Sequence, residues 1–245
     1  MRLNILQWNV WFKENPDNIV KNIIKWKADI ICAQELIQDS RKNIDTAKYI
    51  ANKLGFNCYY HQADTWDNRE EKETQGNAIF SKYPIKKKVH YYVQEPKHNP
   101  LDASHEGRVY IETAVSLTNL TFKIGTTHLS YSDRFILDDH RRQESDNLVN
   151  ILKKKNNKFV FTGDLNSTPT SYTVNQIEKY LTNAGPDYEY NTWTTKPFHY
   201  DNFKEDKLNW RLDYIFTTKD IKVKSAKVIN SKYSDHLPIL LTIEI

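Results

Sequence analysis

The chain has 245 residues, of which 39% are hydrophobic and 13% aromatic, so it can bury a substantial core and is not disordered throughout. Its formal net charge of +4 is mildly basic, which permits a polyanionic partner but does not demonstrate one. Two cysteines are too few for a disulfide framework, and this usage is typical of a reducing compartment.

The N-terminus and the lysine runs carry no clear targeting or partner signal. Residues 1–10 contain no apolar signal-peptide core, and no stretch approaches the roughly 18 apolar residues of a membrane span. The lysine runs at 86–88 and 153–155 are interpreted as solvated surface rather than as a track for phosphates. We therefore expect a cytoplasmic protein without stable membrane insertion.

Strands and helices are predicted to interleave along the chain. Short apolar runs predict strands at 3–10, 29–33, 56–61, 77–81, 89–93, 109–116, 122–127, 159–162, 212–217, 223–229 and 237–243. Longer periodic runs predict helices at 16–27, 40–54, 133–154 and 170–181. The segments 63–75, 94–107 and 182–210 are interpreted as loops, the last of them a long surface loop.

The order of these elements predicts an α/β fold in a single domain that spans residues 1–245. Many consecutive strands are joined by hairpin-length connections, so the sheets should be mixed rather than entirely parallel. Two packed mixed β-sheets with helices outside them account for the pattern.

Six short polar clusters stand at or near the predicted ends of strands. They are Gln7-Trp8-Asn9, Gln34-Glu35, Thr127-His128-Leu129, Gly163-Asp164-Leu165-Asn166, Arg211-Leu212-Asp213-Tyr214 and Ser234-Asp235-His236. A single carboxylate at a strand end is more often a helix cap or a loop hydrogen-bonding group. Six clusters in this order indicate a shared site instead.

This combination of Trp-Asn, Gln-Glu, Gly-Asp-x-Asn and a terminal Ser-Asp-His resembles the endonuclease/exonuclease/phosphatase superfamily. That superfamily includes pancreatic-type deoxyribonuclease, exonuclease III, neutral sphingomyelinases, inositol polyphosphate 5-phosphatases and tyrosyl-DNA phosphodiesterases. The likeness extends from about residue 3 to the C-terminus, and the segments 76–81 and 234–238 are typical as well. It implies a four-layer α/β sandwich of the deoxyribonuclease I type, with the site at one edge of two sheets.

The resemblance implies a divalent-metal-dependent hydrolase that cuts a phosphoester by one in-line attack of an activated water. Glu35, Asn9 and Asp235 are the implied metal-site residues, and Asn9 would offer its amide oxygen to the metal or a donor to the phosphate. Carboxylate and amide oxygens are hard ligands, which suit Mg²⁺ or Mn²⁺.

The implied catalytic residues are His128, Asp164, Asn166, Asp213 and His236. Asp213 should hydrogen-bond His236 and favour its protonated form, so that the pair stabilises charge on the transition state. His128 is the second imidazole beside the phosphate. Asp164 should orient or deprotonate the water, which requires burial or the metal to raise its basicity, and Asn166 should hold the phosphate or the water.

One position departs from the deoxyribonuclease-like members of the superfamily. Those members often carry an acidic residue just before the strand that begins near Gly76, where it supports the equivalent of His128. This chain has Gln75 there, with Glu73 close by. The departure argues against simple transfer of a deoxyribonuclease function.

The loops, rather than the shared catalytic set, should select the substrate. The candidate substrate-binding residues are Arg108, Tyr131, Arg141, Trp193 and Trp210. Aromatic residues interleaved with basic ones suit single-stranded or frayed nucleic acid, because bases stack on the rings. The same aromatic residues could instead contact a lipid headgroup interface or close a small satellite core. We therefore expect a monomeric, nuclease-like phosphodiesterase that acts on nucleic acid or a nucleic-acid adduct.

Two alternatives remain open. The substrate could be a small phosphorylated molecule or a phospholipid, as in sphingomyelinases, although the apolar hairpin of a lipid enzyme is not evident in the sequence. An alternative of another class is a non-catalytic binding module on the same fold. Such modules usually lose a metal carboxylate or a histidine, whereas this chain keeps Glu35, Asp235 and His236.

Overall fold

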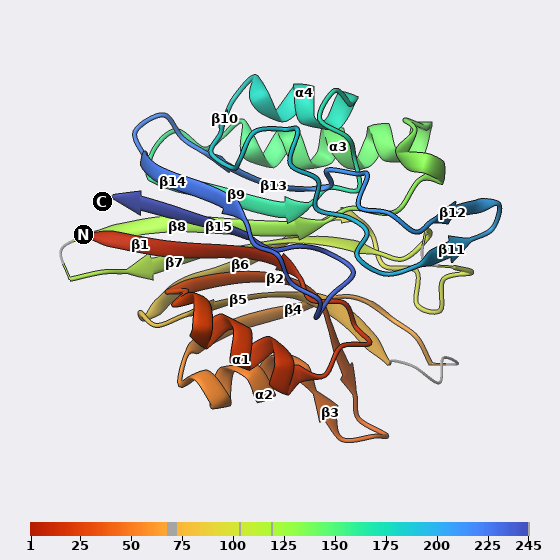
Figure 1. Ribbon diagram of the computed structural model, residues 1–245, viewed down its shortest axis with the longest axis horizontal. Coiled ribbons are helices and arrows are strands. Elements are labelled where there is room, and N and C mark those ends of the chain that lie inside the picture. Colours follow the sequence, from red (N-terminus) through yellow and green to blue (C-terminus); the bar gives the residue numbers. More distant parts are fainter. Residues whose placement is uncertain (68–72, 103, 119, 245) are drawn as a thin grey trace.

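The computed structural model describes residues 1–67, 73–102, 104–118 and 120–244, which form four layers (Figure 1). Helices α1 (Pro16–Trp26) and α2 (Thr46–Leu54) cover the outer face of one sheet. Helices α3 (Asp139–Leu152) and α4 (Tyr172–Glu178) cover the outer face of the other. The predicted α/β sandwich of two packed sheets flanked by helices is confirmed.

Both sheets are mixed, as predicted. The first has the spatial order β14 (Lys222–Val228), β15 (Ile239–Glu244), β1 (Arg2–Asn9), β2 (Ile30–Asp39), β5 (Thr74–Ser81) and β4 (Asn57–Thr65), with β3 (Ile44–Asp45) against β2. The second has the order β10 (Thr182–Asn183), β13 (Asp213–Thr217), β9 (Phe159–Asp164), β8 (Thr121–His128), β7 (Arg108–Ser116) and β6 (Ile85–Gln94). A separate hairpin consists of β11 (Phe198–Tyr200) and β12 (Phe203–Glu205).

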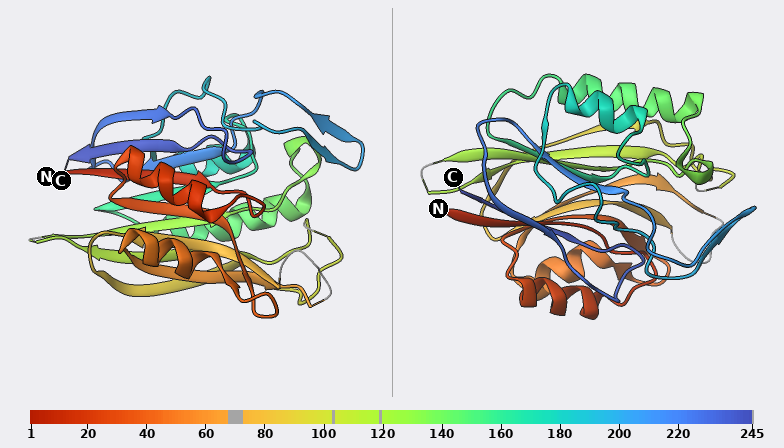
Figure 2. Two further views of the ribbon diagram at one scale, coloured as in Figure 1. Left: turned by 60° about the horizontal axis from the view of Figure 1, so that its bottom comes forward. Right: turned by 45° about the horizontal axis from the view of Figure 1, so that its top comes forward.

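Two parallel strand pairs bring four strand ends to one end of the sandwich. β1 is parallel to β2, and β8 is parallel to β9. The polar residues that follow these strands therefore meet at this end, from which the hairpin of β11 and β12 extends (Figure 2). Both chain termini lie at the opposite end, where Arg2 of β1 pairs with Glu244 of β15.

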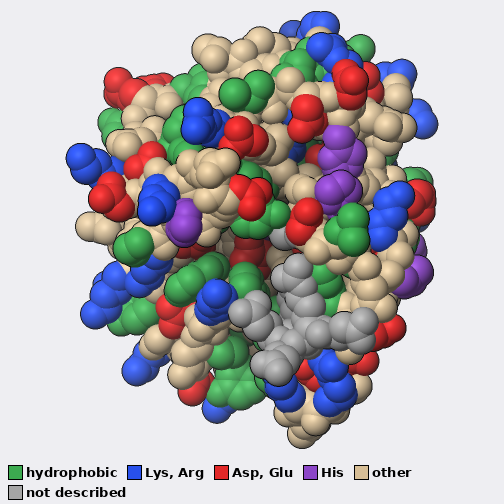
Figure 3. Space-filling view, turned by 90° about the vertical axis from the view of Figure 1, so that its right-hand side faces the viewer, with side chains coloured by type: hydrophobic (Ala, Val, Ile, Leu, Met, Phe, Trp, Pro, Cys, Tyr) green, Lys and Arg blue, Asp and Glu red, His purple; other side chains and the backbone are tan. Residues whose placement is uncertain are grey.

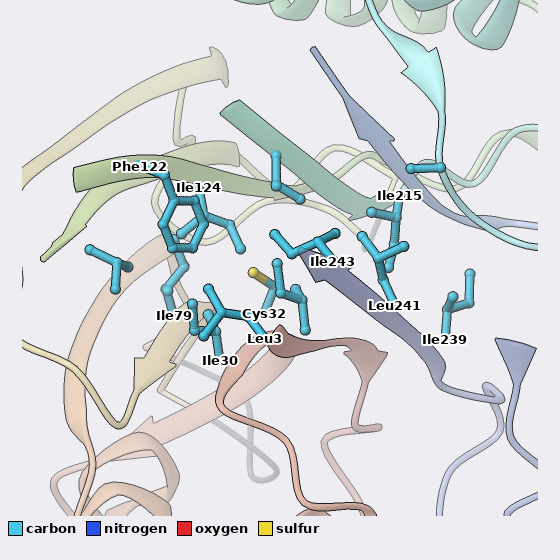
Figure 4. Close-up of a cluster of buried hydrophobic side chains, with 14 of the residues drawn as sticks. Leu3, Ile30, Cys32, Ile79, Phe122, Ile124, Ile215, Ile239, Leu241 and Ile243 are labelled. Atoms are coloured by element: carbon cyan, nitrogen blue, oxygen red, sulfur yellow. The ribbon is translucent and has the colours of Figure 1, made fainter. Parts of the chain in front are cut away.

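The core between the sheets follows from the alternation of side chains along each strand. Leu3 and Ile5 of β1 pack between the two sheets, whereas Leu6 and Trp8 pack against α1 and α2. Figure 4 shows the inter-sheet cluster, in which Cys32 lies among aliphatic side chains from both sheets. Burying each large aliphatic side chain stabilises the fold by about 1.5–3 kcal/mol.

Two predicted helices begin later than their periodicity suggested. The helix predicted at 40–54 begins only at Thr46, because residues 44–45 pair with β2 and the Asp45 side chain caps α2. The helix predicted at 133–154 is interrupted after a 3₁₀ turn, η1 (Asp133–Phe135). Arg134 is left-handed there (φ 49°), and α3 begins after the Asp138 cap.

The segment 182–210 is not the surface loop that its irregular sequence suggested. It contributes β10, β11 and β12, and its Trp193 and Phe203 are buried in a cluster with Phe135 and Leu212. These aromatic side chains pack against one another rather than against a sheet face, so neither strand nor helix periodicity marks them.

The predicted loop at 63–75 is shortened from both sides, because β4 extends to Thr65 and β5 begins at Thr74. Its residues 68–72 lie outside the described residues. Across the described part of the chain, no helix has the length and apolar character needed to cross a membrane.

The inter-sheet core predicts a large difference between two leucine truncations. Leu241→Ala removes a fully buried side chain and should lower the free energy of unfolding by about 2–5 kcal/mol. Leu101→Ala is the matched control, because Leu101 is 90% exposed and its truncation should change stability by less than about 0.5 kcal/mol. Urea unfolding followed by tryptophan fluorescence measures both, and equal losses would contradict this description of the core.

Candidate active site

The side chains that lie between the two sheets change from apolar to polar toward the end of the sandwich where β1, β2, β8 and β9 end, which is called the loop end here. The inter-sheet positions run Leu3, Ile5, Gln7 and Asn9 in β1, and Phe122, Ile124, Thr126 and His128 in β8. Because side chains repeat every two residues along a strand, each row that begins in the core ends in the candidate site. This periodicity explains why the six polar clusters converge.

A belt of buried hydrogen bonds separates the core from the site. Gln7 Nε2 donates to Gln34 Oε1 at 2.6 Å, and Gln34 Nε2 donates to Thr126 Oγ1 of the other sheet at 2.8 Å. Thr162 Oγ1 donates to Thr126 Oγ1 at 2.9 Å. Since an unpaired buried polar group costs about 1–3 kcal/mol, the belt favours one register between the two sheets.

His236 lies between two buried carboxylates. Its Nδ1 is 2.8 Å from Asp213 Oδ2, and its Nε2 is 3.4 Å from Asp164 Oδ2. Burial alone would lower the pKa of His236, but the negative charges of Asp213, Asp164 and Asp235 raise it well above its ordinary value. The contact expected between Asp213 and His236 is present, and it favours a protonated imidazole.

Asp164 stands at the end of β9, opposite His128 in the parallel ladder. Its Oδ1 accepts the Asn166 amide N–H at 2.9 Å, and its Oδ2 is 3.5 Å from His128 Nε2. Burial raises the pKa of Asp164 to about 7, with Asp213 adding to the shift and His236 opposing it. A carboxylate with such a pKa can accept a proton near neutral pH.

Asn166 connects the two loops that carry His128 and Asp164. Its Nδ2 donates to the Leu129 carbonyl at 2.9 Å and lies 3.2 Å from His128 Nε2. The residue adopts a left-handed backbone (φ 44°), which asparagine tolerates better than most residues.

Glu35 and Asn9 come from the ends of β2 and β1. Glu35 is left-handed (φ 61°) at a bulge in β2, which turns its carboxylate toward the site. Asn9 Nδ2 donates to Glu35 Oε1 at 2.9 Å and to Asp164 Oδ2 at 3.0 Å. The amide therefore bridges two carboxylates, and its own oxygen accepts the Trp11 N–H at 3.1 Å.

The donor set at this point fits a hard divalent cation. Burial raises the pKa of Glu35, and the negative charge of Asp235 raises it further. A cation between these carboxylates would relieve that repulsion, and oxygen ligands are those that Mg²⁺ and Mn²⁺ prefer. Asp164, Asp213 and His236 also place ligand atoms within 4.8 Å of one another.

These residues border a cavity of about 390 Å³ that opens at the loop end of the sandwich. Figure 3 shows this end, where a recess near the centre has acidic side chains deep inside it. The basic residues of the lining are Lys13, Arg108 and Lys196, and the acidic ones are Glu35, Glu106, Asp164 and Asp235. The lining is therefore close to electrically neutral or slightly acidic before a metal binds.

One wall of the cavity is aromatic. Tyr131, Phe198 and Trp193 line it, with the Tyr131 and Phe198 rings 5.9 Å apart and the Trp193 and Phe198 rings 4.9 Å apart. Trp193 Nε1 also donates to Asp235 Oδ2 at 3.2 Å. Tyr131 and Phe198 are half-buried and offer aromatic surface to an organic group, whereas the buried Trp193 holds one of the carboxylates in place.

Most of the residues selected from the sequence converge on this cavity. The residues that meet at its floor are Asn9, Glu35, His128, Asp164, Asn166, Asp213, Asp235 and His236. Three more line the cavity, namely Arg108, Tyr131 and Trp193. The structure does not bring Arg141 and Trp210 to it. Arg141 is buried behind the floor and donates to the Leu165 carbonyl, whereas Trp210 Nε1 donates to Glu205 behind the aromatic wall.

Sequence reasoning missed the residues that shape the cavity from irregular segments. Asp64, buried near the end of β4, accepts the backbone N–H groups of Lys97, His98 and Gly107. This carboxylate folds the loop that presents Glu106 at the lining. No periodicity marks these positions, and the only signal was their place in a long loop after a strand.

Thr192 is a second missed residue, and it acts on the backbone of the site. Its Oγ1 accepts the N–H groups of Leu212 and Asp213 at 3.0 and 3.2 Å, and its carbonyl accepts that of Leu237 at 2.7 Å. A lone threonine in an irregular segment carries no sequence signal of this role.

The sequence matches a known protein family, and the fold is similar to those of solved structures. The sequence matches the protein family described as Endonuclease/Exonuclease/phosphatase family over residues 6–236. No curated protein matches it significantly. Among solved structures, an endonuclease/exonuclease/phosphatase family protein from Leptotrichia buccalis is 21% identical, with a TM-score of 0.72 over 99% of this chain and 100% of that one.

Two further solved structures are similar at the level of the fold. The catalytic domain of human Nocturnin, with a bound sulfate anion, is 19% identical, with a TM-score of 0.73 over 99% of this chain and 93% of that one. A mannosyl-6-phosphatase from Bacteroides thetaiotaomicron is 18% identical, with a TM-score of 0.68 over 99% of this chain and 100% of that one. At these identities the likeness concerns the fold alone.

The contact between Asp213 and His236 predicts a pH-dependent stability difference in the metal-free protein. Asp213→Asn should lower the pKa of His236, because it removes a negative charge 2.8 Å from Nδ1. A histidine whose pKa is higher in the folded than in the unfolded protein stabilises the fold. This stabilisation is fully present below the ordinary histidine pKa of about 6.5 and is lost as the pH rises through the raised pKa. The wild type should therefore exceed Asp213→Asn in stability most at low pH.

Nuclear magnetic resonance of the His236 imidazole across pH measures the pKa, and urea unfolding at several pH values measures the stability. An unchanged His236 titration in Asp213→Asn would contradict the assigned interaction.

Proposed function

Because the chain belongs to the Endonuclease/Exonuclease/phosphatase family, we propose that it is a divalent-metal-dependent hydrolase that cuts a phosphoester by in-line attack of a water molecule. Members of this family are generally phosphoester hydrolases. The observation that carries the proposal is the contact of His236 with Asp213 and Asp164, set beside Glu35 and Asp235 in one cavity.

Glu35 and Asp235 would hold the cation, and Asn9 would hold Glu35 in place through the hydrogen bond from its amide. The family is generally dependent on divalent metals, and the hard oxygen donors favour Mg²⁺ or Mn²⁺. When bound, a divalent cation supplies positive charge against the phosphoryl oxygens.

The chain's own residues account for the remaining tasks. Asp164, whose pKa burial raises to about 7, takes a proton from the attacking water. Protonated His236, held by Asp213, donates a hydrogen bond to a phosphoryl oxygen as charge develops there. His128 and Asn166 flank the phosphate from the second sheet, where their own hydrogen bonds orient them.

For the substrate, we propose a single-stranded end of a nucleic acid, or an adduct at such an end. The aromatic wall of Tyr131, Trp193 and Phe198 supports this choice, since bases stack on such rings. A long duplex track is not favoured, because the lysine runs at 86–88 and 153–155 lie at the end of the sandwich opposite the cavity.

A small phosphorylated molecule is the second candidate. The nearly neutral lining favours a substrate that carries few phosphates, and the Bacteroides neighbour is named as a mannosyl-6-phosphatase. Glu106 and Arg108, 3.6 Å apart at the lining, offer an acceptor and donors to the polar groups of such a molecule.

Hydrolysis of bis-p-nitrophenyl phosphate should require Mg²⁺ or Mn²⁺ and stop when EDTA is added. Glu35→Gln keeps the side-chain volume but removes the anionic ligand, so the metal concentration for half-maximal rate should rise by at least about tenfold. His236→Ala should lower kcat by on the order of 100-fold or more, because it removes a donor to the developing charge. His140→Ala, at an exposed position on α3, is the matched control and should retain wild-type rates.

Turnover that is independent of metal, or unaffected in His236→Ala, would refute the proposed mechanism. The absence of any turnover on this diester and on a panel of DNA, RNA, inositol phosphate, hexose phosphate and sphingomyelin would favour the non-catalytic binding module.

The composition of the cavity lining predicts a weak dependence on salt. If every basic lining residue contacts a phosphate of a single strand, the slope of log kcat/KM against log salt should be about −2 or shallower. Oligonucleotides of increasing length should therefore gain little in kcat/KM beyond the first few nucleotides. Steady-state rates at several salt concentrations measure the slope, and a much steeper slope would indicate an extended polyanion track outside the cavity.

A further inference from the structure

A buried ion pair on α3 lies behind the floor of the cavity. Arg141 stands in the first turn of the helix and Glu144 one turn further on, and their side chains are 3.5 Å apart. Arg141 is only 2% exposed and Glu144 is fully buried. Neither residue lines the cavity, so neither can contact a substrate there.

Arg141 holds the loop that carries Asp164 and Asn166. Its Nη1 donates to the Leu165 carbonyl at 2.9 Å. The N–H at the other end of the same peptide unit, that of Asn166, donates to Asp164 Oδ1 at 2.9 Å. Since Asn166 is left-handed, a conformation that costs about 1–3 kcal/mol, the surrounding contacts must hold this peptide in its orientation.

Glu144 holds the other catalytic loop, the one that follows His128. It accepts the Ser130 amide N–H at 3.2 Å and also accepts the Ser130 hydroxyl. The two loops are joined directly, because the Leu129 N–H donates to the Asp164 carbonyl and Asn166 Nδ2 donates to the Leu129 carbonyl. The ion pair therefore fixes two loops that must keep His128, Asp164 and Asn166 in register.

Stability alone does not account for this arrangement. Within the described part of the structure, Arg141 Nε and Nη2 contact no acceptor, and burial lowers the pKa of the guanidinium. Such a pair is often no more stable than well-packed apolar side chains of similar volume. The contacts to Leu165 and Ser130 give it a second effect that apolar side chains could not supply.

We propose that Arg141 and Glu144 are a positioning pair, which sets the relative geometry of the two catalytic loops and acts on the reaction through Leu165 and Ser130. The inference rests on the proposed phosphoester hydrolysis and deepens it. Displacement of catalytic groups by about 1 Å can cost on the order of 100-fold in rate even when the altered residue lies away from the chemistry. The pair should accordingly affect kcat and leave substrate binding nearly unchanged.

The test compares Arg141→Met, Glu144→Gln, Arg141→Lys and the double variant Arg141→Met/Glu144→Gln on bis-p-nitrophenyl phosphate with saturating Mn²⁺. Arg141→Met and Glu144→Gln, which each remove one charge of the pair, should each lower kcat by about 100-fold, with KM within about threefold of wild type. The double variant should lose no more than either single variant, because the two residues act as a unit. Arg141→Lys keeps the charge and one donor, so it should recover a large part of kcat.

Arg142→Met is the matched control, because Arg142 is the exposed neighbour whose guanidinium lies over the Tyr172 ring. It should keep the wild-type kcat. All rates are measured at a temperature where circular dichroism shows each variant to be folded. If Arg141→Met does not fold, Glu144→Gln carries the test: a lower kcat at unchanged KM supports the proposal.

Three outcomes would overturn the inference: wild-type kcat in folded Arg141→Met and Glu144→Gln, losses that add in the double variant, or losses that appear in KM alone. Failure of the proposed function is recognised separately, because the wild-type protein would then show no metal-dependent turnover.

Discussion

The site depends on one constraint, the alternation of side chains on the strands that face each other across the sandwich. Rows of side chains that begin in the apolar core end in the candidate site, and a slip of one residue would turn each row toward the helices. The belt of Gln7, Gln34, Thr126 and Thr162 opposes such a slip, because its hydrogen bonds join the two sheets at one register. The candidate active site is in this sense the polar end of the core.

Burial gives the proposed catalytic groups properties that the free amino acids do not have. Asp164 is surrounded by protein and acquires a pKa of about 7, while His236 is kept protonated by the carboxylates around it. These charges are costly to bury, and the fold offsets the cost with neighbouring hydrogen bonds from Asn9 and from backbone N–H groups. The same arrangement leaves the carboxylates Glu35 and Asp235 in mutual repulsion, which a cation would relieve.

Helix α3 contributes to the site without lining it. Its ion pair contacts the backbone of the loops after β8 and β9, so the outer helical layer stabilises the geometry of the cavity floor. The segment between β10 and β13 supplies Trp193 and Phe198 of the aromatic wall and also holds Asp213 and Leu237 through Thr192. The proposed catalytic residues and the walls of the cavity thus come from different parts of the chain.

The sequence by itself determined the fold class and the residues at the cavity floor, because strand periodicity and short motifs such as Gly163 to Asn166 are local signals. Only the tertiary structure decided the walls and the roles of individual side chains. Arg141 was a candidate substrate ligand but is buried behind the floor, and Trp193 and Phe203, which were assigned to a long surface loop, form a buried cluster. Those outcomes depend on which irregular segments pack together, and such long-range packing leaves no periodic trace in the sequence.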